Sequence, residues 1–251
     1  MKKLNILQIS CVYNEIDFLP HQINYIKSQG LDVYVIDNYS NDGTWEWLKE
    51  NKIPSHQLDT NDMFDLWKNQ TELGETAKKL NADWVYFADA DLFPVSQNLT
   101  IREFVEVADE QGYNSIFTDT IHLLNTGEER KDLFNTYFYG DKQNKWLKIV
   151  KTEFLGRLMG DGIIMNDYKS MQKIEEEEIF LFNFGMTKDK SQREKTLKRR
   201  KKAWVNGMNN NWGVGFIDAK NKNWMWKKED LVDVRTEYKE HFNNLTESLN
   251  E

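Results

Sequence analysis

Short apolar runs alternate with helical patterns along the first hundred residues of the chain. The run at residues 4–12 is short, apolar and rich in β-branched side chains, which predicts a buried strand. Two further strands are predicted at 32–36 and 84–88, and three helices at 17–28, 44–50 and 64–80. This alternation favours an α/β fold with a mostly parallel sheet flanked by helices.

The second half of the chain is less regular. It predicts helices at 101–111, 188–204 and about 228–249, and strands at 115–120 and 146–150. Because the chain has only three prolines and no Ser/Gly-rich run, no flexible linker is expected to divide it. We therefore predict one domain at 1–226 and a helical C-terminal extension at 227–251.

Composition narrows the class of protein. Aromatic residues make up 13% of the chain and nine are Trp, which excludes a disordered chain, and the net charge of -8 argues against nucleic-acid binding. Cys11 is the only cysteine, so neither an internal disulfide nor a thiolate-rich metal site can form. Polar residues interrupt the N-terminal apolar run, and no run reaches the roughly 20 apolar residues of a membrane helix. We expect a cytoplasmic protein.

Polar clusters follow three of the predicted strands. They begin at Asn14, Asp37 and Asp89, and ligands bind beyond the carboxyl ends of parallel strands. Alternation along a strand sends Asp89 and Asp91 to one side, where two carboxylates repel each other unless a cation or a donor lies between them. Mg²⁺ and Mn²⁺ prefer such oxygen ligands. Asp-X-Asp is also common in solvated turns, but its position after the apolar run WVYFA favours a functional site.

The other two clusters each have a structural alternative. Asp37 begins a turn in which it could accept hydrogen bonds from a nucleobase or ribose, or the turn could simply lead into a helix with Thr44 as N-cap. Asn14 or Asp17 could cap the first helix, or Asn14-Glu15 could line a nucleotide pocket. The residues leave both questions open.

The segments VYNE, DNYSNDGTWE and WVYFADADLFP, in this order, resemble glycosyltransferase family 2 over roughly the first 100 residues. The resemblance implies a Rossmann-like GT-A fold, a nucleoside-diphosphate sugar donor (most often UDP), a divalent metal and inversion at the anomeric carbon. It divides the domain into a nucleotide-binding half at 1–100 and an acceptor half at 101–226. It implies a set of donor-site residues: Asn14, Glu15, Asp37 and Asn38 at the nucleoside, Asn69 and Gln70 against the donor, Asp89 at the ribose or metal, and Asp91 as metal ligand.

The stretch Phe182-Asn183-Phe184-Gly185-Met186 resembles a subgroup with His-Tyr-Gly before a basic helix. A histidine there could be a third metal ligand, whereas Asn183 offers a neutral amide oxygen. His122 and His241 are not obvious replacements. Three consequences stay open: weaker metal binding, metal held by Asp91 and phosphates alone, or a degenerate protein that binds a sugar nucleotide or glycan without turnover.

Inverting transfer needs a general base beside the acceptor hydroxyl. The resemblance favours Asp161, between two glycines, ahead of Asp119 and Asp141, although Gly-Asp-Gly is also an ordinary turn. The nine Lys and Arg residues of 188–202 favour a solvated helix face over contact with phosphates, a lipid-diphosphate or an anionic membrane. Packing is likewise favoured over sugar stacking for four tryptophans: Trp204, Trp212, Trp224 and Trp226.

Together these features predict a metal-dependent glycosyltransferase that acts on a hydroxyl of a glycan or lipid-linked acceptor, in glycan or cell-surface polysaccharide synthesis. A nucleotidyltransferase on a similar sheet would need a Gly-rich phosphate loop after the first strand. The segment SCVYNEIDF contains no glycine, which argues against that alternative.

Overall fold

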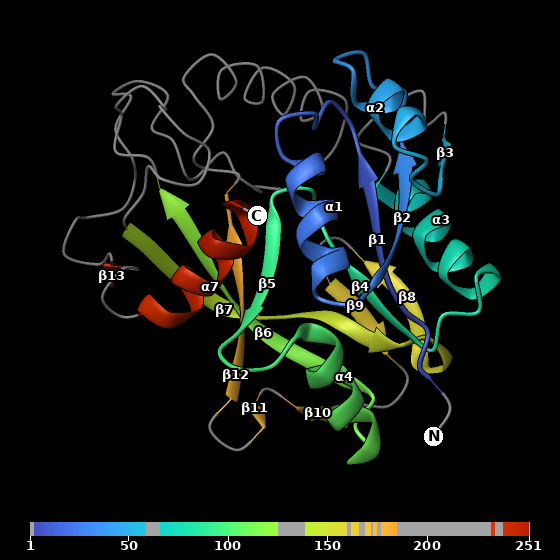
Figure 1. Ribbon diagram of the computed structural model, residues 1–251. Coiled ribbons are helices and arrows are strands. Elements are labelled where there is room, and N and C mark those ends of the chain that lie inside the picture. The colour runs from blue at the N-terminus through green and yellow to red at the C-terminus, as the bar shows by residue number, and fades with distance from the viewer. Residues whose placement is uncertain are drawn as a thin grey trace, which may run out of the picture.

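The computed structural model describes residues 3–58, 66–124, 139–159, 162–165, 169–171, 173–174, 177–184, 232–233 and 238–250 (Figure 1). The first half alternates strands and helices as its apolar pattern predicts, with one additional short strand at Ser55–Gln57 that the pattern does not predict. Its elements are β1 (Ile6–Val12), α1 (Leu19–Ser28), β2 (Asp32–Asp37), α2 (Thr44–Glu50), β3 (Ser55–Gln57), α3 (Leu66–Lys79) and β4 (Trp84–Phe87).

The second half contributes longer strands than its sequence pattern predicts. After β5 (Leu92–Ser96) and α4 (Ile101–Glu110) come β6 (Ser115–Leu124) and β7 (Tyr139–Lys151), which are joined over most of their length. The remaining elements are a 3-10 turn (Thr152–Phe154), β8 (Leu155–Met159), β9 (Gly162–Met165), β10 (Ser170–Met171), β11 (Lys173–Ile174), β12 (Glu177–Asn183), β13 (Val232–Asp233) and α7 (Lys239–Asn250). The final helix predicted from 228 therefore begins later, because residues 232–233 pair with β7 as a strand.

One mixed sheet forms the centre of the α/β fold, with strand order β11-β12-β6-β7-β4-β1-β2-β3. The four strands β4, β1, β2 and β3 are parallel, and β7 lies antiparallel between β4 and β6. Since β12 is parallel to β6, the strands β1, β2, β4, β6 and β12 all run in one direction. Their carboxyl ends therefore meet at the same edge of the sheet, at the top of Figure 1.

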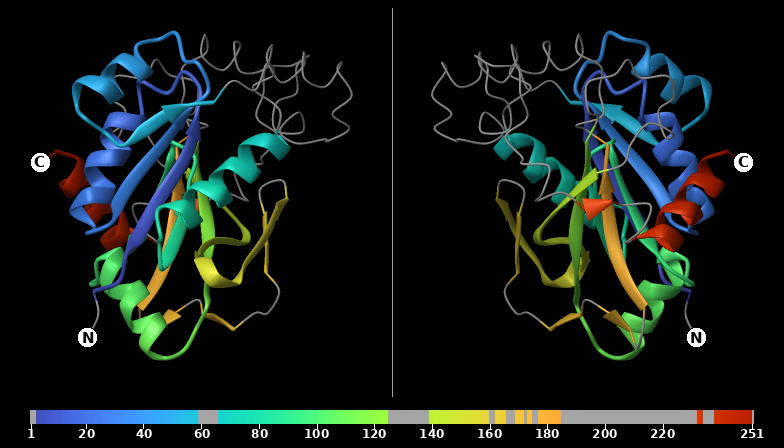
Figure 2. Two further views of the ribbon diagram at one scale, coloured as in Figure 1. Left: turned by 90° about the vertical axis from the view of Figure 1, so that its right-hand side faces the viewer. Right: turned by 90° about the vertical axis from the view of Figure 1, so that its left-hand side faces the viewer.

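Helices α1, α4 and α7 cover one face of the sheet, and α3 with the β8–β9 hairpin covers the other (Figure 2). The larger apolar core lies under the first face and includes Phe18, Tyr86 and Phe104. Helix α7 is part of this packing, because Leu245 is fully buried in the same core. No helix among the described residues is long and apolar enough to cross a membrane.

Two helix caps that the sequence leaves open as alternatives do not form. Helix α2 begins at Thr44 itself, after Gly43 at φ +98°, so Thr44 is the first helical residue rather than the N-cap. Helix α1 begins after Phe18 and has no side-chain cap, so neither Asn14 nor Asp17 fills that role. At the start of α2, the side chain of Asp42 accepts a hydrogen bond from the backbone N–H of Thr44 (3.0 Å). This local bond takes the place of a side-chain cap.

Candidate functional site

Four of the strand ends carry the polar side chains that the sequence singles out. We call this edge, formed by the residues that follow β1, β2 and β4 and by the end of β12, the carboxyl rim. Parallel β1, β2 and β4 bring three turns side by side there, and β12 reaches the rim through its pairing with β5. The rim therefore carries Asn14, Asp37, Asp89, Asp91 and Asn183.

The turns after β1 and β2 are joined by reciprocal hydrogen bonds between Asn14 and Asn41. The Asn14 amide Nδ2 donates to Asn41 Oδ1 (3.0 Å), and the Asn41 backbone N–H donates to Asn14 Oδ1 (2.8 Å). The backbone N–H of Asn14 also donates to Ser40 Oγ (2.9 Å). Asn14 has φ +57°, a left-handed conformation that asparagine adopts more readily than most residues. Its side chain thus joins two turns of the rim.

Asp42 fixes the backbone on both sides of this junction. Its Oδ1 accepts from the Thr44 hydroxyl (2.6 Å), and its Oδ2 accepts from the Ile16 backbone N–H (3.2 Å). The Thr44 hydroxyl in turn accepts from the backbone N–H of Glu15 (3.1 Å). Asn41 and Asp42 are site-forming residues that the sequence does not single out, because turn composition alone does not reveal bonds to residues 26 or 27 positions away.

Asp37 points into the turn after β2 rather than toward solvent. Its side chain is fully buried, and its Oδ2 accepts from the Ser40 backbone N–H (3.1 Å) and from Gln57 Nε2 (3.0 Å). The next residue, Asn38, is also buried and donates its backbone N–H to the Val12 carbonyl (2.8 Å). In this structure Asp37 shapes the rim, and its predicted contact with the nucleoside stays a prediction.

The turn Asp89-Ala90-Asp91, called the aspartate turn below, lies next to the end of β12. Asp89 is exposed and Asp91 is half-buried, and the Leu92 N–H donates to the Asp89 carbonyl (3.1 Å). The Phe184 N–H donates to the Asp91 carbonyl (2.9 Å), and Asn183 is the register partner of Leu92. The structure therefore brings Asp91 and half-buried Asn183 together from positions 92 residues apart in the sequence.

Burial and nearby carboxylates together raise the pKa of two groups close to the rim. Burial and the nearby charges of Asp89, Asp37 and Glu72 raise the pKa of the Cys11 thiol to about 12. Burial and the charges of Asp89 and other neighbours likewise raise the pKa of Tyr86 well above its usual value. The Cys11 thiol and the Tyr86 hydroxyl become anions when they lose a proton, so nearby negative charges raise the pKa of each.

Three residues at the aspartate turn and the end of β12 carry oxygens of the kind that bind divalent metals. Asp89, Asp91 and Asn183 offer carboxylate and amide oxygens, which Mg²⁺ and Mn²⁺ prefer. Among the described residues no group of three His, Cys, Asp or Glu side chains could hold a metal ion. One or two protein carboxylates suffice for Mg²⁺ when substrate phosphates and water complete its coordination.

The backbone of His122 lies beside that of Asn183, a pairing that the sequence pattern does not predict. Asn183 and His122 are register partners in the parallel pair of β12 and β6, and His122 is the register partner of Asp141 on β7. His241 belongs to α7, and its ring packs edge-on against the ring of Phe180 on β12 (centroids 4.9 Å apart). Tertiary pairing therefore brings one of the two histidines to the strand ends, and no local signal in the sequence predicts that.

Several predicted residues cannot be placed with their side chains. Asp161, the basic stretch 188–202 and the four tryptophans at 204, 212, 224 and 226 lie outside the described residues. The first turns of α3 contain Asn69 and Gln70, and β7 contains Asp141, without described side chains. Asp119 is buried on β6, in register with Phe180.

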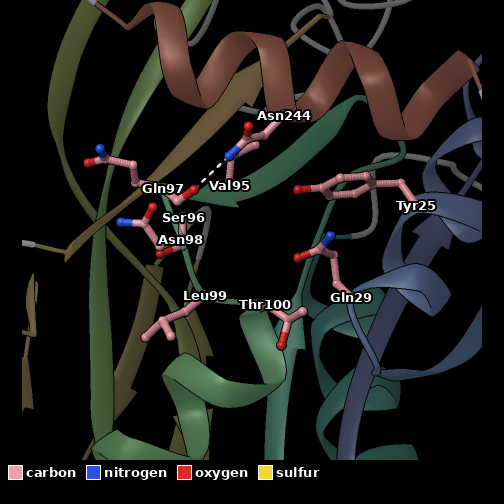
Figure 3. Close-up of a pocket in the computed structure, with 9 residues that line it drawn as sticks. All are labelled: Tyr25, Gln29, Val95, Ser96, Gln97, Asn98, Leu99, Thr100 and Asn244. Atoms are coloured by element: carbon pink, nitrogen blue, oxygen red, sulfur yellow. Dashed lines mark hydrogen bonds between the residues drawn. The ribbon is translucent and has the colours of Figure 1, made fainter.

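A small pocket lies away from the rim, beyond the far end of β5 (Figure 3). Its volume is about 130 Å³, and side chains of α1, the β5–α4 connection and α7 line it, including Tyr25, Gln29 and Thr100. There Asn244 Nδ2 of α7 donates to the Gln97 carbonyl (2.6 Å). This contact attaches α7 to the domain at a place remote from the aspartate turn.

Solved structures with a similar fold include S. aureus TarS (residues 1–349, with UDP), at 17% identity and a TM-score of 0.41 over 60% of this chain and 48% of that one. HddC from Yersinia pseudotuberculosis, complexed with GMP-PN, has 11% identity and a TM-score of 0.40 over 80% of this chain and 100% of that one. The chain thus spans about half the length of the TarS chain. At these scores we draw no functional conclusion from the likeness.

No curated protein sequence matches the chain. A family model does match it, over residues 9–160, which include the end of β1, the aspartate turn and the strands up to β8. The matched family is described as Glycosyl transferase family 2. The matched range covers more than half of the chain and contains the three turns that form the rim. The chain therefore belongs to glycosyl transferase family 2.

Proposed function

We propose that this protein transfers a sugar from a nucleoside-diphosphate sugar, with UDP as the nucleotide, to a hydroxyl group of a glycan or lipid-linked acceptor, with inversion. The observation that carries the proposal is the rim itself. Three polar turns follow three parallel strands, and the aspartate turn lies beside Asn183 in a chain that belongs to family 2. Synthesis of a glycan or cell-surface polysaccharide is the corresponding role.

Each group of rim residues has a proposed role that follows from its position. The turns after β1 and β2, with Asn14, Glu15, Asp37 and Asn38, form the wall proposed for the nucleoside. Asp89, Asp91 and Asn183 would hold Mg²⁺ or Mn²⁺, which offsets the charge of the leaving diphosphate when bound. The carboxylates and the diphosphate are both anionic and repel each other at short range. A cation must therefore lie between them before the diphosphate can bind.

Two further roles extend to residues outside the described part of the chain. We propose Asp161 as the base that removes the proton from the acceptor hydroxyl, and residues 101–226 as the acceptor half of a domain that spans 1–226. Residues 188–202 are the proposed place of any contact with an anionic membrane or lipid-linked acceptor.

A second candidate is a degenerate member that binds a sugar nucleotide without turnover. Asn183 favours it, because an amide oxygen is a weaker metal ligand than an imidazole or a carboxylate. Both candidates predict metal-assisted nucleotide binding, and only the first predicts release of the nucleotide from a sugar donor.

The test is hydrolysis of UDP-sugars and GDP-sugars by the full chain, measured as released UDP or GDP with Mn²⁺ and with EDTA. We expect release that depends on Mn²⁺ and that falls at least about a hundredfold in Asp91→Asn, since lost charge at the metal weakens stabilisation of the leaving group. Asp32→Asn is the matched control, because exposed Asp32 begins β2 at the opposite edge of the sheet.

Two outcomes would count against catalysis. Nucleotide binding without release, in the presence of a panel of glycan and lipid-linked acceptors, would support the degenerate candidate. Release that continues unchanged in EDTA and in Asp91→Asn would remove the aspartate turn from the mechanism. Asp161→Asn tests the base separately: transfer to acceptor should fall while nucleotide affinity stays the same.

A further inference from the structure

Gln22 is a buried glutamine on the apolar face of α1, directly beneath the aspartate turn. Leu19, Gln22 and Ile26 have the i, i+3, i+7 spacing of one helix face, and all three are fully buried. The side-chain Nε2 of Gln22 donates to the Asp89 carbonyl and to the Leu92 carbonyl (2.8 Å). One amide group therefore bonds the backbone on both sides of the turn.

The two hydrogen bonds from Gln22 add to a small number of backbone hydrogen bonds that hold the aspartate turn. Within the turn the Leu92 N–H donates to the Asp89 carbonyl (3.1 Å), and from β12 the Phe184 N–H donates to the Asp91 carbonyl (2.9 Å). Gln22 adds the connection to α1. The spacing and direction of the Asp89 and Asp91 side chains follow from this backbone.

Core stability alone does not explain a glutamine at this place. Its Oε1 is buried, and none of the described residues donates a hydrogen bond to it. A buried acceptor without a partner destabilises a fold, and an apolar side chain of similar shape would avoid that cost. The bonds that Nε2 makes to the turn, rather than core packing, distinguish a glutamine from an apolar side chain at this place.

We propose that Gln22 is a positioning residue, which sets the backbone of the aspartate turn so that Asp89 and Asp91 can bind a divalent cation together with a nucleoside diphosphate. This rests on the proposed function. Gln22 touches neither ligand and acts only through the carbonyls of Asp89 and Leu92. Residues that orient metal ligands from outside the coordination sphere change metal affinity by roughly 10- to 100-fold when replaced.

The test compares Gln22→Met, which keeps the volume and removes the donor, with Tyr25→Phe. Tyr25 is the matched control, because it lies one turn further along α1, is buried, and donates its hydroxyl to the Pro94 carbonyl (2.6 Å) inside β5 rather than to the turn. Both variants lose a buried donor between α1 and the same segment, so a merely structural role predicts similar effects. Gln22→Asn, whose shorter amide cannot reach both carbonyls, is the second variant if Gln22→Met does not fold.

Two measurements are made on each protein. The affinity for Mn²⁺ in saturating UDP is measured by electron paramagnetic resonance of free Mn²⁺, and hydrogen exchange is measured in the peptide that covers the aspartate turn. We expect Mn²⁺ affinity to fall about tenfold in Gln22→Met and Gln22→Asn and to stay within about twofold of wild type in Tyr25→Phe. Exchange in the turn should rise in the Gln22 variants only.

The outcomes separate this inference from the proposed function. If the wild type binds Mn²⁺ with UDP and Gln22→Met binds it equally well, the positioning role is overturned and the proposed function stands. If the wild type binds no Mn²⁺ in the presence of UDP or GDP, the proposed function is overturned, and with it the role of Gln22 toward the cation.

Discussion

Asp37 provides a test of how a buried carboxylate shapes the carboxyl rim. Its Oδ2 accepts from the Ser40 backbone N–H (3.1 Å) and from Gln57 Nε2 (3.0 Å), and its side chain is fully buried. Asp37→Ala removes both acceptor contacts and leaves two donors without their partner. Asp37→Asn keeps an oxygen that can take the Oδ2 position and removes only the charge.

The magnitudes follow from the number of donors. A hydrogen bond to a charged group contributes about 1.5–3 kcal/mol, and Gln57 is half-buried, so that its amide can recover part of the loss by bonding water. We expect Asp37→Ala to lower the free energy of unfolding by about 2–4 kcal/mol. We expect Asp37→Asn to stay within about 1 kcal/mol of wild type, because both bonds remain and a buried charge is removed.

The assay is urea unfolding followed by circular dichroism. The slope of the unfolding free energy against urea concentration is compared between variants, because a changed slope would mean that the unfolding transition itself differs. If Asp37→Asn loses as much stability as Asp37→Ala, the charge itself stabilises the turn and our reasoning from the two bonds is refuted. If neither variant loses stability, the bonds of Asp37 to Ser40 and Gln57 do not form in solution.

Three further predictions concern other described residues. Burial raises the pKa of Asp109, but hydrogen bonds from Lys151 and Trp84 outweigh this and lower the pKa overall. The stability that Asp109 contributes is therefore fully present above its unfolded pKa of about 4 and is lost as the pH falls through its lower folded-state pKa. Asp109→Asn should cost about 1 kcal/mol at pH 7 and less at pH 3, measured by denaturant unfolding. Burial and nearby carboxylates raise the pKa of the partly exposed Cys11 thiol to about 12, so it should react with a disulfide reagent at pH 8 far more slowly in the native protein than after unfolding in guanidinium. Equal reaction rates in the two states would contradict the raised pKa. Asn183→His should raise Mn²⁺ affinity in the presence of UDP by roughly tenfold, and an unchanged titration would place residue 183 outside the metal site.

The sequence by itself determined most elements of the first half and the positions of the rim residues, but not the short strands β3 and β5. Apolar runs and turn-forming residues are local signals, and they correctly predicted β1, β2, β4 and the turns that follow them. The ordered segments around Asn14, Asp37 and Asp89 also predicted the family, which the match over 9–160 confirms. Parallel strands share a direction, so their shared edge followed from the fold class alone.

Only the tertiary structure decided which side chains meet. Asn14 bonds Asn41, and Asn183 lies beside Asp91, because strand register brings together residues far apart along the chain. Gln22 could have been noticed at the i+3 position of an apolar helix face, but its two acceptors belong to a turn nearly 70 residues away. Local propensity is a property of neighbouring residues, whereas register and buried hydrogen bonds depend on how the sheet and its helices pack.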